Sequence, residues 1–211
     1  MADPDGVITF STRFEGDESP LTEAGRWHHT GRDWTIVAKA NGVAYGTQTG
    51  KGNFDDSYAY LAGFPPNQSA SAVLHLDGKI GRGTTHEVEI LLRWSDSERS
   101  ARGYECNFAF DGSYVQIVRW NGPRGDFTYL AGESAPGGGS VPGGIRDGDT
   151  VSAQIVGRVI TVFVRGKPVA TATDATFASG NPGIGFWRGG DSGLLLGDYG
   201  FTSYTANSLA P

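Results

Sequence analysis

Three acidic side chains lie at spacings that could support chemistry. Glu87 and Glu89 are two residues apart in the segment Thr85 to Trp94, and Glu105 lies in the segment that follows it. If that segment is a strand, the two glutamates share a face, with Cβ atoms roughly 6 to 7 Å apart. Carboxyl groups about 5 Å apart suit retaining cleavage of a glycosidic bond, and wider pairs suit inverting cleavage. Glu89 with Glu105, across two neighbouring strands, is another such pair.

A different set of residues suits elimination from a uronic acid. Tyr114 is a candidate acid or base, with Asn107, Gln116 or Arg93 to neutralise the uronate carboxylate. Nearby glutamates would repel that carboxylate, so the acidic charge of this face favours hydrolysis over elimination. The Tyr, Asn, Gln and Arg residues, by contrast, are the types that elimination requires. Both reactions stay open, with Glu89, Glu105 and Tyr114 as the catalytic candidates.

The same surface could also bind a sugar without cleaving it. Amides and carboxylates form hydrogen bonds with vicinal hydroxyls, and aromatic rings stack on the C–H face of a pyranose. The alternative is an ordinary solvated sheet face with cross-strand Glu–Arg pairs. The candidate ligand-binding residues are Glu87, Arg93, Asn107, Gln116, Trp120 and Trp187.

Strands have to position these residues. Val88, Ile90 and Leu92 alternate with Glu87, Glu89, Leu91 and Arg93, which predicts one apolar and one polar face. The same alternation puts Glu105 and Asn107 on the polar side of the next strand. The stretch from Asp149 to Ile184 reads as three further strands joined by turns too short for a crossover helix. We therefore predict an all-β fold, a two-sheet antiparallel β-sandwich formed by one domain over residues 1–211.

Composition limits the classes of partner. The chain has 211 residues, a formal net charge of -6 and a pI near 5.1, which makes nucleic acid and anionic membranes poor partners. Cys106 is the only cysteine, so an intrachain disulfide and a thiolate metal centre are excluded, and we expect a buried thiol. No stretch is apolar for long enough to span a bilayer, and no signal peptide is visible, although export stays open.

The central strands and the last strand carry a family resemblance. The pattern Val-x-Ala-x-Ile-x-Gly from Val151, the Gly-Ile-Gly-Phe at 183–186 and the final segment 197–204 resemble the concanavalin A-like (laminin G-like) jelly-roll domains of secreted bacterial carbohydrate-active proteins. That architecture hosts lectins, glycoside hydrolases, polysaccharide lyases and adhesive modules. The chain lacks the Glu-x-Asp-x-x-Glu signature of laminarinase-type hydrolases. It also lacks the Arg-(Ser/Thr)-Glu-Leu and Gln-(Ile/Val)-His motifs of jelly-roll alginate lyases.

The resemblance also implies a structural calcium ion where the first and last strands meet. Glu15, Asp17 and Asp198 would supply its carboxylate oxygens. The alternative is that these are solvated carboxylates in turns and at a strand edge.

Taken with the resemblance, these residues predict a carbohydrate-binding domain that uses its concave sheet. A polysaccharide-cleaving enzyme on the same face, glycoside hydrolase or lyase, is the first alternative. An adhesive or structural domain without a sugar site is the second. We expect an oligo- or polysaccharide partner, no nucleic acid or membrane partner, a monomeric state, and a secreted or cell-surface location.

Overall fold

The computed structural model describes residues 7–51, 54–77, 86–133, 135–190 and 193–210. Within those residues it contains fourteen strands and no helix, so nothing there could cross a membrane as a helix. The predicted all-β sandwich is confirmed. The strands are β1 (Thr9–Thr12), β2 (Thr35–Ala40), β3 (Val43–Gly46), β4 (Ser57–Tyr60), β5 (Gln68–Leu76), β6 (Glu87–Ser97), β7 (Ser100–Ala109), β8 (Val115–Gly122), β9 (Phe127–Ala131), β10 (Thr150–Val156), β11 (Val159–Val164), β12 (Lys167–Thr173), β13 (Asn181–Trp187) and β14 (Tyr199–Ser208).

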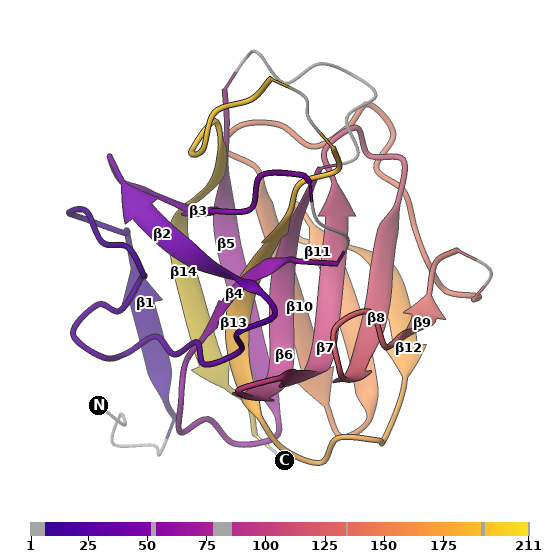
Figure 1. Cartoon of the computed structure of the whole chain (residues 1–211). Helices are drawn as coiled ribbons and strands as arrows, with labels where there is room; N and C mark the ends of the chain where they lie inside the picture. Colours follow the sequence, from indigo (N-terminus) through magenta and orange to yellow (C-terminus); the bar gives the residue numbers. More distant parts are fainter. Residues whose placement is uncertain (1–6, 52–53, 78–85, 134, 191–192, 211) are drawn as a thin grey trace.

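The strands form two layers that face each other (Figure 1). The front sheet has the order β4-β13-β6-β7-β8-β9, and the back sheet has the order β12-β11-β10-β5-β14. β1 and β3 both pair with β14, and β2 joins the layers because it pairs with β3 on one side and β4 on the other. All pairings are antiparallel except that of β2 with β4. The consecutive strands β10, β11 and β12 thus form one side of the back sheet.

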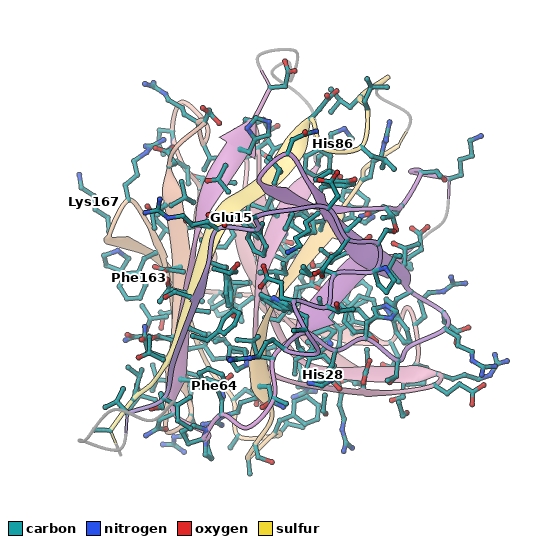
Figure 2. All side chains as sticks on the ribbon, turned by 90° about the vertical axis from the view of Figure 1, so that its left-hand side faces the viewer. Glu15, His28, Phe64, His86, Phe163 and Lys167 are labelled. Atoms are coloured by element: carbon teal, nitrogen blue, oxygen red, sulfur yellow. The ribbon has the colours of Figure 1, made fainter. Side chains whose placement is uncertain are left out.

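Alternation places the apolar side chains between the two layers. Val88, Ile90 and Leu92 of β6 face Val151, Ala153 and Ile155 of β10 within one fully buried core. Cys106 lies in that core with Tyr104 and Phe108, as expected for an inert thiol. Figure 2, a view along the edge of the layers, shows side chains filling the space between them, whereas Phe163 and Lys167 lie on the outer side of the back sheet.

A β-bulge near the end of β6 changes which side chains face outward. The β6–β7 register shifts between Leu92 and Ser95, and Arg93 has a positive φ of 48°. The alternation is therefore broken: Trp94 packs with Leu91 in a second apolar cluster on the outer face of the front sheet. We call this the outer aromatic cluster; it comprises Trp34, Tyr58, Leu91, Trp94, Ala101, Val118 and Trp120.

Candidate functional site

A pocket of about 220 Å³ lies on the outer face of the front sheet, beside the outer aromatic cluster. Its side chains come from β6, β7, β8 and β9, from the end of β13, and from the segments just before β4, just before β8 and just after β9. The lining residues are Phe54, Asp56, Glu87, Glu105, Asn107, Tyr114, Gln116, Val118, Trp120, Phe127, Tyr129, Glu133 and Trp187. None of these is basic, so the pocket is aromatic and acidic.

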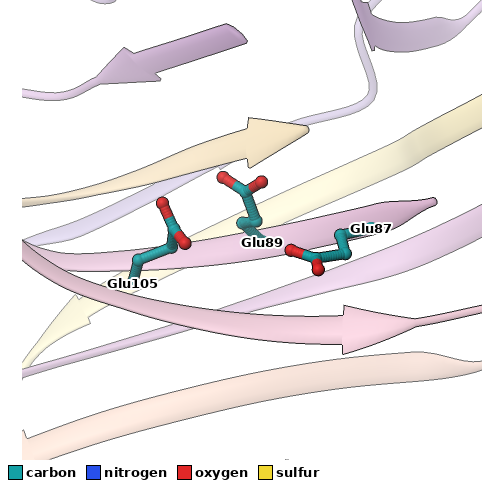
Figure 3. A group of neighbouring side chains, drawn as sticks. All are labelled: Glu87, Glu89 and Glu105. Atoms are coloured by element: carbon teal, nitrogen blue, oxygen red, sulfur yellow. The ribbon is translucent and has the colours of Figure 1, made fainter. Parts of the chain in front are cut away.

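Three glutamates form a compact group at this pocket: Glu87 and Glu105 line it, and Glu89 lies beside them. Glu87 and Glu89 project from β6 and Glu105 from β7, where Glu89 pairs with Asn107 and Leu91 pairs with Glu105. Taking one carboxylate oxygen from each glutamate, all three atoms lie within 4.8 Å of one another. Figure 3 shows the three carboxylates gathered over the two strands. The spacing predicted from the alternation of β6 and β7 therefore does bring these groups together.

Two of the glutamates are held by hydrogen bonds. Tyr114 donates its Oη hydrogen to Oε1 of Glu87, and the Nδ2 of Asn107 donates to Oε2 of Glu87 at 2.8 Å. Trp120 donates its Nε1 hydrogen to Oε2 of Glu105 at 2.7 Å. The neighbouring side chains thus fix the orientation of both carboxylates.

Glu89 differs from its two neighbours. It is 1% exposed, and neither carboxylate oxygen has a hydrogen-bond partner among the described residues. Gly185 of β13 makes room for it, since a Cβ at that position would collide with Oε2 of Glu89. The Oδ1 atom of Asn107 is likewise buried without a partner in the described part of the chain. Two oxygen atoms of Glu89 and one of Asn107 therefore have no hydrogen-bond partner among the described residues.

Burial shifts the protonation of the whole group. Burial raises the pKa of Glu87 to about 7, even though its bonds to Tyr114 and Asn107 pull it down. Burial, followed by the charge of Glu87, raises the pKa of Glu105 to about 8. The pKa values of Glu89 and Asp56 are raised well above their usual range, first by burial and then by the neighbouring carboxylates, Glu105 foremost. Burial is therefore the largest cause of all four pKa shifts, and neighbouring carboxylates add to it for Glu89, Glu105 and Asp56.

Aromatic rings form the remaining wall of the pocket. Phe127 of β9 packs against Phe54, Trp120 and Tyr129, with ring centroids 5.2, 5.5 and 5.4 Å apart respectively. Trp187, the last residue of β13, pairs with Glu87 and completes the lining. Apolar faces and buried carboxylates thus meet in one small volume.

Most of the residues predicted for the site do lie at the pocket. Those in its lining are Glu87, Glu105, Asn107, Tyr114, Gln116, Trp120 and Trp187, and Glu89 belongs to the acidic group beside it.

Arg93, predicted as a ligand-binding residue, does not line the pocket, because it lies at the bulge and its side chain is engaged elsewhere. Its guanidinium donates to the carbonyl oxygens of Pro66, Phe177 and Gly157 at 2.9, 2.8 and 2.7 Å. It therefore ties loops together at one end of the sandwich.

The carboxylates predicted to bind calcium do not form a group of their own. Glu15 and Asp17 are exposed, and Oδ1 of Asp17 accepts a hydrogen bond from the amide of Asn41. Oδ2 of Asp198 accepts one from the amide of Leu195 at 2.8 Å. In the described part of the chain, the acidic residues close enough to share one ion are Glu87, Glu89 and Glu105. A calcium ion at the strand ends stays a prediction.

Six lining residues were not anticipated from the sequence: Phe54, Asp56, Val118, Phe127, Tyr129 and Glu133. Phe127 and Tyr129 alternate on the short edge strand β9, so a period of two was the signal that could have found them. Phe54 and Asp56 precede β4, and no local pattern indicates that this segment folds over the front sheet.

Comparison with known proteins gives a likeness of fold. No family model and no curated sequence matches the chain. Among solved structures, porphyranase B from Zobellia galactanivorans is 11% identical with a TM-score of 0.59, over 99% of this chain and 97% of that one. The carbohydrate-binding module CBM66 from Bacillus subtilis is 13% identical with a TM-score of 0.57, over 87% and 92%. SCLam, a non-specific endo-beta-1,3(4)-glucanase from family GH16, is 12% identical with a TM-score of 0.56, over 99% and 93%.

These similarities confirm the resemblance seen in the sequence at the level of architecture. At such low identity they establish the fold alone, and that fold carries a binding module in one neighbour and enzymes in two others. The chain therefore has the concanavalin A-like jelly-roll fold found among proteins that bind or process carbohydrate.

Proposed function

We propose that this chain binds a saccharide in the pocket on the outer face of its front sheet. The observation that carries the proposal is the lining itself, which combines aromatic rings with buried amides and carboxylates. Rings offer flat apolar faces to the C–H side of a sugar, and the polar groups accept or donate hydrogen bonds to its hydroxyls. The fold shared with CBM66 supports the same reading.

The size and charge of the pocket narrow the ligand. Its volume of about 220 Å³ is below the ~300–1,000 Å³ typical of sites for drug-sized ligands, which favours a single sugar unit or a chain end. Asp56, Glu87, Glu105 and Glu133 line it without a basic residue among them. A neutral sugar is therefore favoured over a uronate or a sulfated sugar, because no side chain in the lining could pair with the anionic group.

Cleavage of a glycosidic bond is the second candidate, favoured by the closeness of the glutamates. Oxygens of Glu87, Glu89 and Glu105 lie within 4.8 Å of one another, and carboxyl groups about 5 to 5.5 Å apart suit a retaining mechanism. Elimination is less well supported, because Arg93 is engaged elsewhere and no basic side chain in the lining could neutralise a uronate. An extracellular location is part of this proposal, because a protein that acts on polysaccharides would encounter them outside the cell.

One experiment separates these possibilities. The protein is incubated with a panel of neutral and acidic polysaccharides and their oligomers, following affinity, new reducing ends and the absorbance of unsaturated uronates. Binding without new reducing ends supports a binding domain. New reducing ends without absorbance from unsaturated uronates indicate hydrolysis, and new reducing ends with that absorbance indicate elimination. Asn107→Ala and Trp187→Ala should weaken retention roughly 10-fold or more, at about 1.4 kcal/mol per tenfold. Gln154→Ala, on the back sheet, is the matched control.

Absence of binding to every member of the panel would contradict the proposal. Equal binding by wild type and both pocket variants would contradict the assignment to this pocket.

A further inference from the structure

The acidic group at the pocket is built entirely from oxygen donors. Glu87, Glu89 and Glu105 each offer a carboxylate oxygen, and these atoms lie within 4.8 Å of one another (Figure 3). All three side chains are buried, with exposures of 7%, 1% and 4% respectively. Carboxylates are rarely buried in such numbers without positive charge beside them.

A second observation, independent of that clustering, points to a missing ligand. Both carboxylate oxygens of Glu89 and the Oδ1 atom of Asn107 lack a partner among the described residues. Asn107 pairs directly with Glu89 across the β6–β7 ladder and donates through Nδ2 to Glu87. Asn107 is 6% exposed, and the hydrogen bond from Nδ2 to Glu87 fixes the orientation of its amide. Leaving a buried acceptor unsatisfied costs free energy that a ligand would recover.

No side chain in the pocket supplies the compensating charge. Its described lining residues include four acidic groups and neither lysine, arginine nor histidine. Arg93, the one arginine of β6, is occupied with three carbonyl oxygens at the end of the sandwich. The negative charge must therefore be offset by protons or by a bound cation.

We propose that Glu87, Glu89 and Glu105 together bind one hard divalent cation of the Ca²⁺ type, with Asn107 Oδ1 as an additional oxygen ligand. Ca²⁺ binds oxygen at about 2.3 to 2.6 Å, so two oxygens on opposite sides of the ion lie about 4.6 to 5.2 Å apart. The 4.8 Å limit within which the three carboxylates lie fits that shell. A donor set without nitrogen or sulfur favours Ca²⁺, Mg²⁺ or Mn²⁺ over softer metals.

This site goes beyond saccharide binding and differs from the calcium ion predicted at Glu15, Asp17 and Asp198. Glu87 and Glu105 line the pocket, so the remaining coordination positions would face water or the hydroxyls of a ligand. Its existence does not depend on a sugar, and it can be tested with the cation alone.

The first test measures cation binding by the chelator-treated protein. Isothermal titration with CaCl₂, MgCl₂ and MnCl₂ should give one site per chain. At a free concentration about 100-fold above Kd, Ca²⁺ should raise the melting temperature by roughly 5 to 10 °C. Terbium should occupy the same position and emit when tryptophan is excited, because Trp120 is hydrogen-bonded to the ligand Glu105.

Matched variants locate the site. Glu89→Gln keeps the shape of the side chain and removes one charge, so cation affinity should fall roughly 10-fold or more. Glu15→Gln makes the same chemical change at an exposed position and should bind as the wild type does. The melting temperature of Glu89→Gln without cation checks that this variant is folded, and it should equal or exceed that of the wild type because one buried repulsion is removed.

Three results would overturn the proposal. Wild-type protein without a heat signal or a melting shift at millimolar cation would mean that protons neutralise the group. Unchanged affinity in Glu89→Gln, or loss of binding in Glu15→Gln, would place the ion elsewhere. None of these results bears on retention by polysaccharides, so failure here is distinguishable from failure of the saccharide proposal.

Discussion

The indole Nε1 of Trp120 donates a hydrogen bond to Oε2 of Glu105 at 2.7 Å, and both side chains are almost completely buried. Trp120 belongs to the outer aromatic cluster, whereas Glu105 belongs to the acidic group. This one bond therefore joins the aromatic wall of the pocket to its acidic group. It also limits the pKa rise that burial imposes on Glu105.

Trp120→Phe tests this connection. The variant keeps an aromatic ring but removes the donor, which should cost about 1 to 3 kcal/mol of unfolding free energy and loosen Glu105. Sugar affinity should fall with it. Trp34→Phe is the matched control, since Trp34 lies in the same cluster, with its ring centroid 6.0 Å from that of Trp120. Its Nε1 has no hydrogen-bond partner among the described residues. Equal losses in urea unfolding for both variants would show that the hydrogen bond contributes nothing beyond packing.

Local alternation was enough to predict the strands that carry the site. Val88, Ile90 and Leu92 face the core, and Glu87 and Glu89 face outward, because side chains on a strand alternate with a period of two. The same reasoning correctly placed Cys106 in the core and Glu105 and Asn107 on the outer face of the sheet.

The bulge at Arg93 could not be predicted from that pattern, because distant residues determine it. The amide of Arg93 donates to Oε1 of Gln68 at 3.0 Å, and Nε2 of Gln68 donates to the carbonyl of Gly180 at 3.0 Å. These contacts join three segments far apart in the sequence. The positions of Asp56 and Phe54 in the pocket lining are likewise set by how the segment before β4 packs against the front sheet.

Arg93→Met should show that this residue maintains the fold and has no part in ligand binding. Removing the guanidinium leaves the carbonyl oxygens of Pro66, Gly157 and Phe177 without their donor, each at about 1 to 3 kcal/mol if it stays buried. We expect a loss of several kcal/mol in urea unfolding, with unchanged sugar and cation affinity in the folded protein. Arg32→Met, which removes only an exposed ion pair with Glu98, should cost at most about 1 kcal/mol. A selective loss of sugar affinity in Arg93→Met would restore the predicted binding role.

Gly185→Ala should disturb the acidic group from the neighbouring strand. Its new methyl group would occupy the space that Oε2 of Glu89 now fills, so the carboxylate must move. Cation affinity should fall roughly 10-fold or more, as in Glu89→Gln. The control is a double-mutant cycle, because Glu89→Ala removes the atoms in closest contact and leaves only Cβ, 3.2 Å from the new methyl group, so Gly185→Ala should cost less stability there. Additive losses in thermal unfolding would show that the two positions do not interact.

Acid stability should depend on Asp96, which lies outside the pocket. Burial pushes its pKa upward, but four hydrogen bonds from the amide and hydroxyl of Thr30 and the hydroxyls of Tyr58 and Tyr60 outweigh burial and hold it below the ordinary value. A carboxyl whose pKa is lower in the folded state stabilises that state above its unfolded pKa of about 3.9. The contribution is lost as the pH falls through the folded pKa. Asp96→Asn should therefore reduce stability at pH 7 and flatten the decline between about pH 5 and 2. Urea unfolding across that range measures both effects. An equally steep decline in the variant would assign the acid sensitivity to other carboxylates. Asp174 is the next one to test in the same way, because it accepts a hydrogen bond from Tyr104 and pairs with Arg119.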